Sequence, residues 1–85
     1  MEKTKYIIKD ENGIHARPAG LLVKLAGGFT SDIKLIKGEK SADLKRLFAV
    51  MGLGIKKGDE ILVTANGDDE KMAVETIELF LKTNL

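Results

Sequence analysis

With 85 residues, the chain is long enough for one small domain, residues 1–85, and too short for two. Its 14 basic and 13 acidic residues nearly balance, and no basic cluster carries interleaved aromatic residues, which argues against a nucleic-acid partner. The absence of cysteine and the presence of one histidine exclude a disulfide framework and a thiolate or multi-histidine metal site. No metal or other cofactor is expected.

The N-terminal part predicts a strand followed by a helix. Residues 4–9 are rich in β-branched and aromatic side chains, which predicts a strand that ends at the turn-forming run 10–13. Apolar residues at three- and four-residue spacing then predict a helix over residues 16–25. Pro18 is compatible with this helix because amides of the first turn have no intrahelical partner.

The remaining segments predict a hairpin, a short helix, a strand and a final helix. Residues 31–37 and 40–42 form the expected hairpin around Lys37-Gly38-Glu39. Residues 44–53 carry apolar side chains at helical spacing, bounded by Gly52 and Gly54. Residues 60–65 alternate like a strand, and residues 70–82 carry an apolar helical stripe after an N-cap candidate in the run 66–69.

The expected element order is therefore βαββαβα. The helix stripes must cover one face of the sheet, which favours an α+β open-faced β-sandwich, with a four-stranded antiparallel sheet covered on one side by three helices. The other sheet face stays open. The β-α-β halves favour a split β-α-β layout, although the sequence alone leaves the strand order undetermined.

The most informative segment contains the single histidine and the single proline, with Arg17 between them. His15 is expected at the start of a helix, where free backbone amides around Ala16 and Arg17 and the helix dipole favour an anion such as a phosphoryl group. The helix N-terminus and the Arg17 guanidinium should also favour the neutral, nucleophilic imidazole. Pro18 offers no donor but restricts the backbone. The alternative is that His15 is an ordinary surface or capping residue.

The sequence does not predict an autonomous ATP-using enzyme. Its glycines are expected in turns, and none belongs to a nucleotide-binding phosphate loop. Phosphoryl transfer depends mostly on positioning and electrostatics, so a small domain could take part with a second protein that supplies the rest. No apolar run reaches the ~18 residues of a membrane span and no targeting segment is evident, so a cytoplasmic location without direct membrane insertion is expected.

Around His15-Ala16-Arg17-Pro18-Ala19, the chain resembles HPr, the histidine-containing phosphocarrier family of the bacterial phosphoenolpyruvate-dependent sugar phosphotransferase system. The resemblance continues through Gly28-Phe29-Thr30-Ser31, Val50-Met51-Gly52-Leu53-Gly54, Lys57-Gly58 and Ala65-Asn66-Gly67-Asp68. It therefore covers essentially the whole chain. The fold it implies, four antiparallel strands under three helices, agrees with the element order.

The resemblance implies a carrier rather than an enzyme. His15 would accept a phosphoryl group from phosphorylated Enzyme I on Nδ1 and pass it to A-type domains of sugar-specific permeases, with Arg17 supporting the transferred phosphate and Ala16, Arg17 and Pro18 forming its site. The implied docking surface comprises Gly20, Leu21, Lys24, Lys45, Leu47, Phe48 and Met51. Plain core packing is the alternative for its apolar members, but Leu47 and Phe48 are adjacent on a helix and cannot both point inward. A carrier that docks through one face is expected to be a monomer.

One position departs from the family pattern. Some members carry a regulatory serine just before the second helix, and this chain has Arg46 there, so no regulatory serine is expected at that site. Ser41, the nearest serine, is expected in the hairpin. Two other functions remain open: a regulatory protein-binding module that uses the surface of the first two helices, and a carrier for a nitrogen-related phosphotransfer branch.

Overall fold

Seven elements follow one another in the predicted order in the computed structural model, which describes residues 1–85. No helix is long and apolar enough to cross a bilayer. The elements are β1 (Glu2–Ile7), α1 (Ala16–Ala26), β2 (Asp32–Lys37), β3 (Lys40–Asp43), α2 (Leu47–Met51), β4 (Glu60–Asn66) and α3 (Glu70–Asn84).

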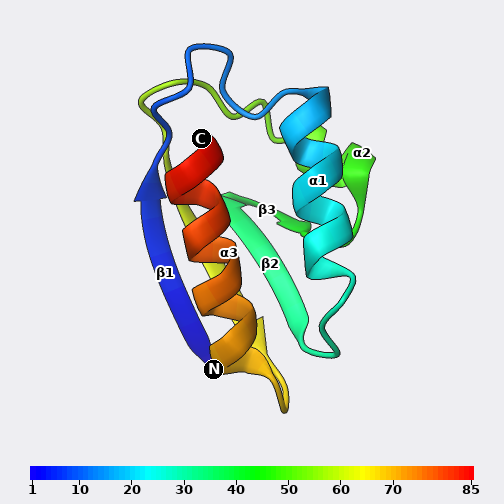
Figure 1. Cartoon of the computed structure of the whole chain (residues 1–85). Coiled ribbons are helices and arrows are strands. Elements are labelled where there is room, and N and C mark those ends of the chain that lie inside the picture. Colours follow the sequence, from blue (N-terminus) through cyan, green and yellow to red (C-terminus); the bar gives the residue numbers. More distant parts are fainter.

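The four strands form one antiparallel sheet in the order β1-β4-β2-β3. Because β4 lies between β1 and β2, the layout is the split β-α-β arrangement that the sequence favoured. Figure 1 shows α1 and α3 side by side across one face of the sheet, with α2 beside α1. The predicted α+β open-faced sandwich is confirmed.

The core lies between the sheet and the helices, and strand alternation determines which side chains enter it. In β4, Ile61 and Val63 are fully buried, whereas Leu62 between them is half-buried on the opposite face. Burying such an aliphatic side chain contributes about 1.5–3 kcal/mol. The helices supply the facing apolar stripes, namely Ala19, Leu22 and Ala26 of α1 and Ala73, Val74, Ile77 and Leu81 of α3.

The second helix is shorter than the predicted 44–53 and comprises five residues, Leu47–Met51. Asp43 delays its start, because its carboxylate accepts a hydrogen bond from the Lys45 amide and its carbonyl accepts one from the Arg46 amide. Leu44 is instead buried before the helix, and its amide donates to the Ile33 carbonyl. Periodicity alone did not reveal this turn.

The first strand is also displaced from the predicted 4–9 and spans Glu2–Ile7. The Ile8 amide still bonds the Asp59 carbonyl, but the Lys9 and Asp10 amides both donate to the Leu85 carbonyl. The chain therefore leaves the sheet at this point for the end of α3. The other predicted boundaries differ from the observed ones by one or two residues, as helix and strand ends commonly do.

A carboxylate joins the start of α3 to the connection between α1 and β2. Asp69 lies at the N-cap position of α3, but its side chain does not cap that helix as predicted. It accepts bonds from the Thr30 amide (2.9 Å), the Ser31 amide (3.0 Å) and the hydroxyl of buried Ser31. These donors, the Ser31 hydroxyl first, lower the pKa of Asp69 to about 2.

We predict that Asp69→Asn removes part of the acid sensitivity of folding. The folded-state pKa of Asp69, about 2, lies below its ordinary value of 3.8, so its contribution is complete above pH 3.8 and is lost as the pH falls through 2. The variant should be less stable than the wild type at pH 7, and the difference should shrink between pH 4 and 2. Urea unfolding at several pH values measures this. Asp68→Asn, at an exposed neighbour, is the control, and an identical pH dependence in both variants would contradict the assignment.

Candidate functional site

A tight turn leads from β1 to the histidine. The Asp10 carboxylate accepts the Asn12 amide (2.8 Å), and the Asp10 carbonyl accepts the Gly13 amide (3.0 Å). Gly13 has a φ of +63°, and a Cβ there would lie 2.2 Å from the Ile55 carbonyl oxygen. This position therefore requires glycine, both for its backbone conformation and for the close approach of the two chain segments.

The residues after Gly13 place His15 at the start of α1. Ile14 is buried, and its amide donates to the Ile55 carbonyl (3.2 Å). His15 is the N-cap residue, with an extended backbone at φ −103° and ψ 179°, and its carbonyl accepts the Ala19 amide (3.0 Å). Its side chain makes no capping hydrogen bond and is 42% exposed. The backbone of His15 is therefore fixed, and its imidazole ring is accessible from solvent.

The first turn of α1 supplies the donors expected for an anion. The Ala16 and Arg17 amides precede the first intrahelical hydrogen-bonded amide, that of Ala19, and neither donates to a backbone carbonyl. Arg17 is exposed and forms no ion pair, whereas Pro18 is buried. A surface hollow of about 260 Å³ is lined by Asp10, His15, Arg17, Pro18, Leu21 and Asn84. The structure thus places His15, Arg17 and Pro18 around one hollow, and Ala16, which lies between His15 and Arg17, does not line it.

Two residues of this hollow were not identified from the sequence. Asn84 comes from the end of α3, far along the chain, and no sequence pattern links it to His15. Asp10 was interpreted only as a turn residue, yet its Oδ2 lies 4.0 Å from Nε2 of His15. The turn-forming composition of residues 10–13 was the available clue. A tight turn brings its first residue, Asp10, close to the residues that follow the turn, including His15. No group of three or more acidic or histidine side chains could hold a metal ion.

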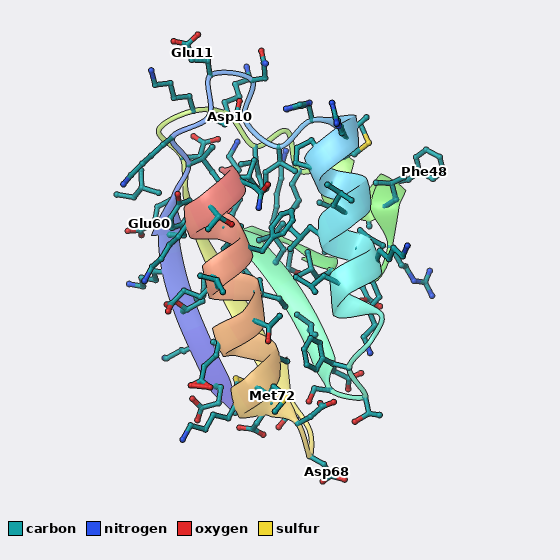
Figure 2. All side chains as sticks on the ribbon, in the orientation of Figure 1. Asp10, Glu11, Phe48, Glu60, Asp68 and Met72 are labelled. Carbon is teal, nitrogen blue, oxygen red and sulfur yellow. The ribbon has the colours of Figure 1, made fainter.

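The residues expected to dock a partner fall into two groups. Leu21, Phe48 and Met51 are 52%, 86% and 38% exposed, and Phe48 points away from the body of the molecule (Figure 2). Lys24 is also exposed and Gly20 is half-buried. We call the five residues Gly20, Leu21, Lys24, Phe48 and Met51 the α1–α2 surface.

The other two predicted docking residues have structural contacts. Leu47 is half-buried and packs against the core, as its position next to Phe48 on a helix implies. Lys45 is half-buried, and its amine donates to the Phe29 carbonyl (2.7 Å). This bond joins the loop before α2 to the loop after α1. Leu47 and Lys45 therefore hold α2 against the rest of the molecule, beneath the exposed side chains of the α1–α2 surface.

Arg46 occupies the N-cap position of α2 and is 78% exposed. Its side chain makes no capping bond, and its Nε lies 3.8 Å from Oδ2 of Asp43. The site therefore carries a cation and no hydroxyl. Because the helix dipole favours an anion at this end, Arg46 is placed unfavourably by roughly 0.3–1 kcal/mol, a cost that the Asp43 pair partly offsets.

Comparisons with known proteins agree on one family. The family model described as "PTS HPr component phosphorylation site" matches residues 2–83. The phosphocarrier protein HPr of Mycoplasma capricolum subsp. capricolum is 44% identical over 78 residues, which are 92% of this chain and 88% of the relative. A solved histidine-containing phosphocarrier protein, described in connection with the divergence of Mycoplasma from Gram-positive bacteria, superposes with a TM-score of 0.94 at 40% identity, over 96% of this chain and 93% of that one.

Structures from Thermoanaerobacter tengcongensis are also similar. HPr-C-His from this organism has a TM-score of 0.93 at 34% identity and covers 98% of this chain and 93% of its own. A structure described as an HPr dimer from the same organism has a TM-score of 0.78 at 34% identity, over 98% of this chain and 95% of that one.

We predict that Gly13→Ala destabilises the protein by more than about 1 kcal/mol, because alanine at positive φ is strained and its methyl group would meet the Ile55 carbonyl. Gly38→Ala is the matched control, since Gly38 has a φ of +59° and a Cβ added there would have no atom within 4 Å. Thermal unfolding should show a clearly larger loss for Gly13→Ala. Equal losses would mean that the contact with Ile55 is not restrictive.

Proposed function

The chain belongs to the HPr family of phosphocarrier proteins of the phosphotransferase system, and on that premise we propose that His15 accepts a phosphoryl group from phosphorylated Enzyme I and passes it to A-type domains of sugar-specific permeases. The observation that carries the proposal is the position of His15: its ring is 42% exposed at the N-terminus of α1, beside the free amides of Ala16 and Arg17.

The chemistry needs no group beyond these residues and the donor protein. The Nδ1 lone pair of neutral His15 attacks the phosphorus atom, the new N–P bond forms, and the bond to the donor breaks with its electron pair remaining on the donor atom. The phosphoryl oxygens then carry negative charge at the helix N-terminus, where the Ala16 and Arg17 amides and the Arg17 guanidinium can donate to them. Transfer to the next protein is the same step in reverse, so the chain acts as a carrier and not as an enzyme with its own product.

The α1–α2 surface is the proposed docking face for both partners. Phe48 and Leu21 supply exposed apolar area, and Lys24 supplies positive charge beside it. Such a surface suits acidic partner domains, with electrostatic steering for fast association and a small apolar contact for quick release. Since one face must serve two partners in turn, we propose that the working form is a monomer in the cytoplasm. Size-exclusion chromatography with light scattering would distinguish it from a dimer.

Phosphorylation at His15 is the direct test of the proposal. Incubation with Enzyme I and phosphoenolpyruvate should add one phosphoryl group, seen by intact-mass measurement, and phosphorus NMR should report a phosphohistidine bonded through Nδ1. His15→Ala should remain unmodified. An unmodified wild-type protein would refute the proposal. If partner binding nevertheless survived in His15→Ala, the regulatory binding module would be the better account.

We expect Phe48→Ala to weaken partner binding without unfolding the protein. The side chain is 86% exposed, so its removal costs little core packing, while loss of a central aromatic contact weakens binding by roughly tenfold, about 1.4 kcal/mol. Met72→Ala is the control, because Met72 is 65% exposed on α3 and lies near the opposite end of the molecule from Asp10 (Figure 2). Calorimetric titration with Enzyme I measures both. Equal affinities for Phe48→Ala and wild type would exclude this docking face.

A further inference from the structure

We propose that Asp10 is a positioning residue for His15: its carboxylate holds the ring proton on Nε2, keeps the Nδ1 lone pair available, and stabilises the ring cation that forms during transfer. This inference rests on the proposed phosphocarrier function. It also makes a claim about the unphosphorylated ring that can be tested without any transfer reaction.

Asp10 is held in place by three hydrogen bonds. Its amide donates to the Leu85 carbonyl (2.9 Å), its carbonyl accepts the Gly13 amide (3.0 Å), and its Oδ1 accepts the Asn12 amide (2.8 Å). The turn therefore fixes the backbone and one carboxylate oxygen. Oδ2 remains free for an interaction outside the turn.

That free oxygen lies on the Nε2 side of the imidazole. Oδ2 of Asp10 is 4.0 Å from Nε2 of His15, and the Asp10 side chain is 28% exposed, less than the ring itself. The separation exceeds a direct hydrogen bond, so the interaction is electrostatic. The two residues share the hollow with Arg17 and Asn84, and Asp10 is the carboxylate among its lining side chains.

The sign of this interaction favours the nucleophilic tautomer. A negative charge beside Nε2 favours a proton there, and in the neutral ring a proton on Nε2 leaves the lone pair on Nδ1. When Nδ1 attacks phosphorus, the Nε2 proton stays in place and the ring becomes cationic. Asp10 then faces a positive charge, so it stabilises the developing ring cation more than the neutral ring, as a carboxylate that orients a catalytic histidine does.

The chain offers a matched control at the next residue. Glu11 is also a carboxylate of this turn, but it is 87% exposed and lies 4.0 Å from the Lys57 amine. Figure 2 shows Glu11 at the outer tip of the turn and Asp10 beneath it. Asp10→Asn and Glu11→Gln therefore remove the same charge from neighbouring positions, and only the first changes the group that faces His15. Asparagine keeps an Oδ1 acceptor for the Asn12 amide, and Asp10→Ser provides a second variant able to form a similar turn.

The first experiment measures the ring tautomer in the unphosphorylated protein. Long-range proton–nitrogen correlation spectra of His15 should show the neutral ring protonated at Nε2 in the wild type and in Glu11→Gln. The Nδ1-protonated fraction should rise in Asp10→Asn and Asp10→Ser. Ring nitrogen shifts in both Asp10 variants that match the wild type would overturn the proposal, whatever the protein's partners prove to be.

The second experiment measures phosphoryl transfer from Enzyme I by rapid quench. Asp10→Asn should transfer roughly fivefold more slowly, the effect of two unit charges about 4 Å apart in a water-like dielectric. Glu11→Gln should transfer at the wild-type rate. Equal slowing in both variants would show a general charge effect and overturn the positioning role. Absence of phosphorylation in the wild type would instead refute the proposed function, and the tautomer measurement would still decide the role of Asp10.

Discussion

The backbone of Gly13 lies against the backbone of Ile55, and the position of the histidine depends on that contact. No side chain fits between the two segments, because a Cβ at residue 13 would lie 2.2 Å from the Ile55 carbonyl oxygen. The Ile14 amide bonds the same carbonyl, so the chain reaches His15 with little freedom. The backbone of the proposed acceptor residue is thereby held in place, and its ring stays exposed to solvent.

Different parts of the fold provide its stability and leave the histidine accessible. One sheet face and the helix stripes form the core, so stability comes from apolar burial, while the His15 ring lies outside that core. The site lies where the β1–α1 turn, the start of α1 and the end of α3 meet, as Figure 1 shows at the upper end of the molecule. Leu21 of α1 lines the hollow at His15, and Phe48 is exposed on α2, which packs against α1. In the proposed docking, a partner at His15 would contact these apolar side chains without disturbing the core.

Sequence patterns predicted the element order, the open-faced sandwich and the place of His15 at a helix start, because each depends on local periodicity and turn chemistry. These patterns failed where contacts with other parts of the chain determine the local structure. The start of α2 depends on the Leu44 amide, which donates to the Ile33 carbonyl of β2, and the role of Asp69 depends on Thr30 and Ser31 from another loop. The sequence indicated only that Asp10 belongs to a turn. The folded turn is what brings Oδ2 of Asp10 toward the histidine ring. The turn composition of residues 10–13 indicated that the chain bends there, but it did not give the distance or direction of the Asp10 carboxylate relative to the ring.

The proposed carrier function depends most on the first-turn amides of α1, which would donate to the oxygens of the phosphoryl group on His15. Proton–nitrogen correlation spectra of the protein before and after phosphorylation by Enzyme I measure this directly. The Ala16 and Arg17 amide protons should move strongly downfield as they donate to the phosphoryl oxygens, while amides of the open sheet face stay unchanged. If His15 were phosphorylated while the chemical shifts of both amides stayed unchanged, this role of the amides would be contradicted.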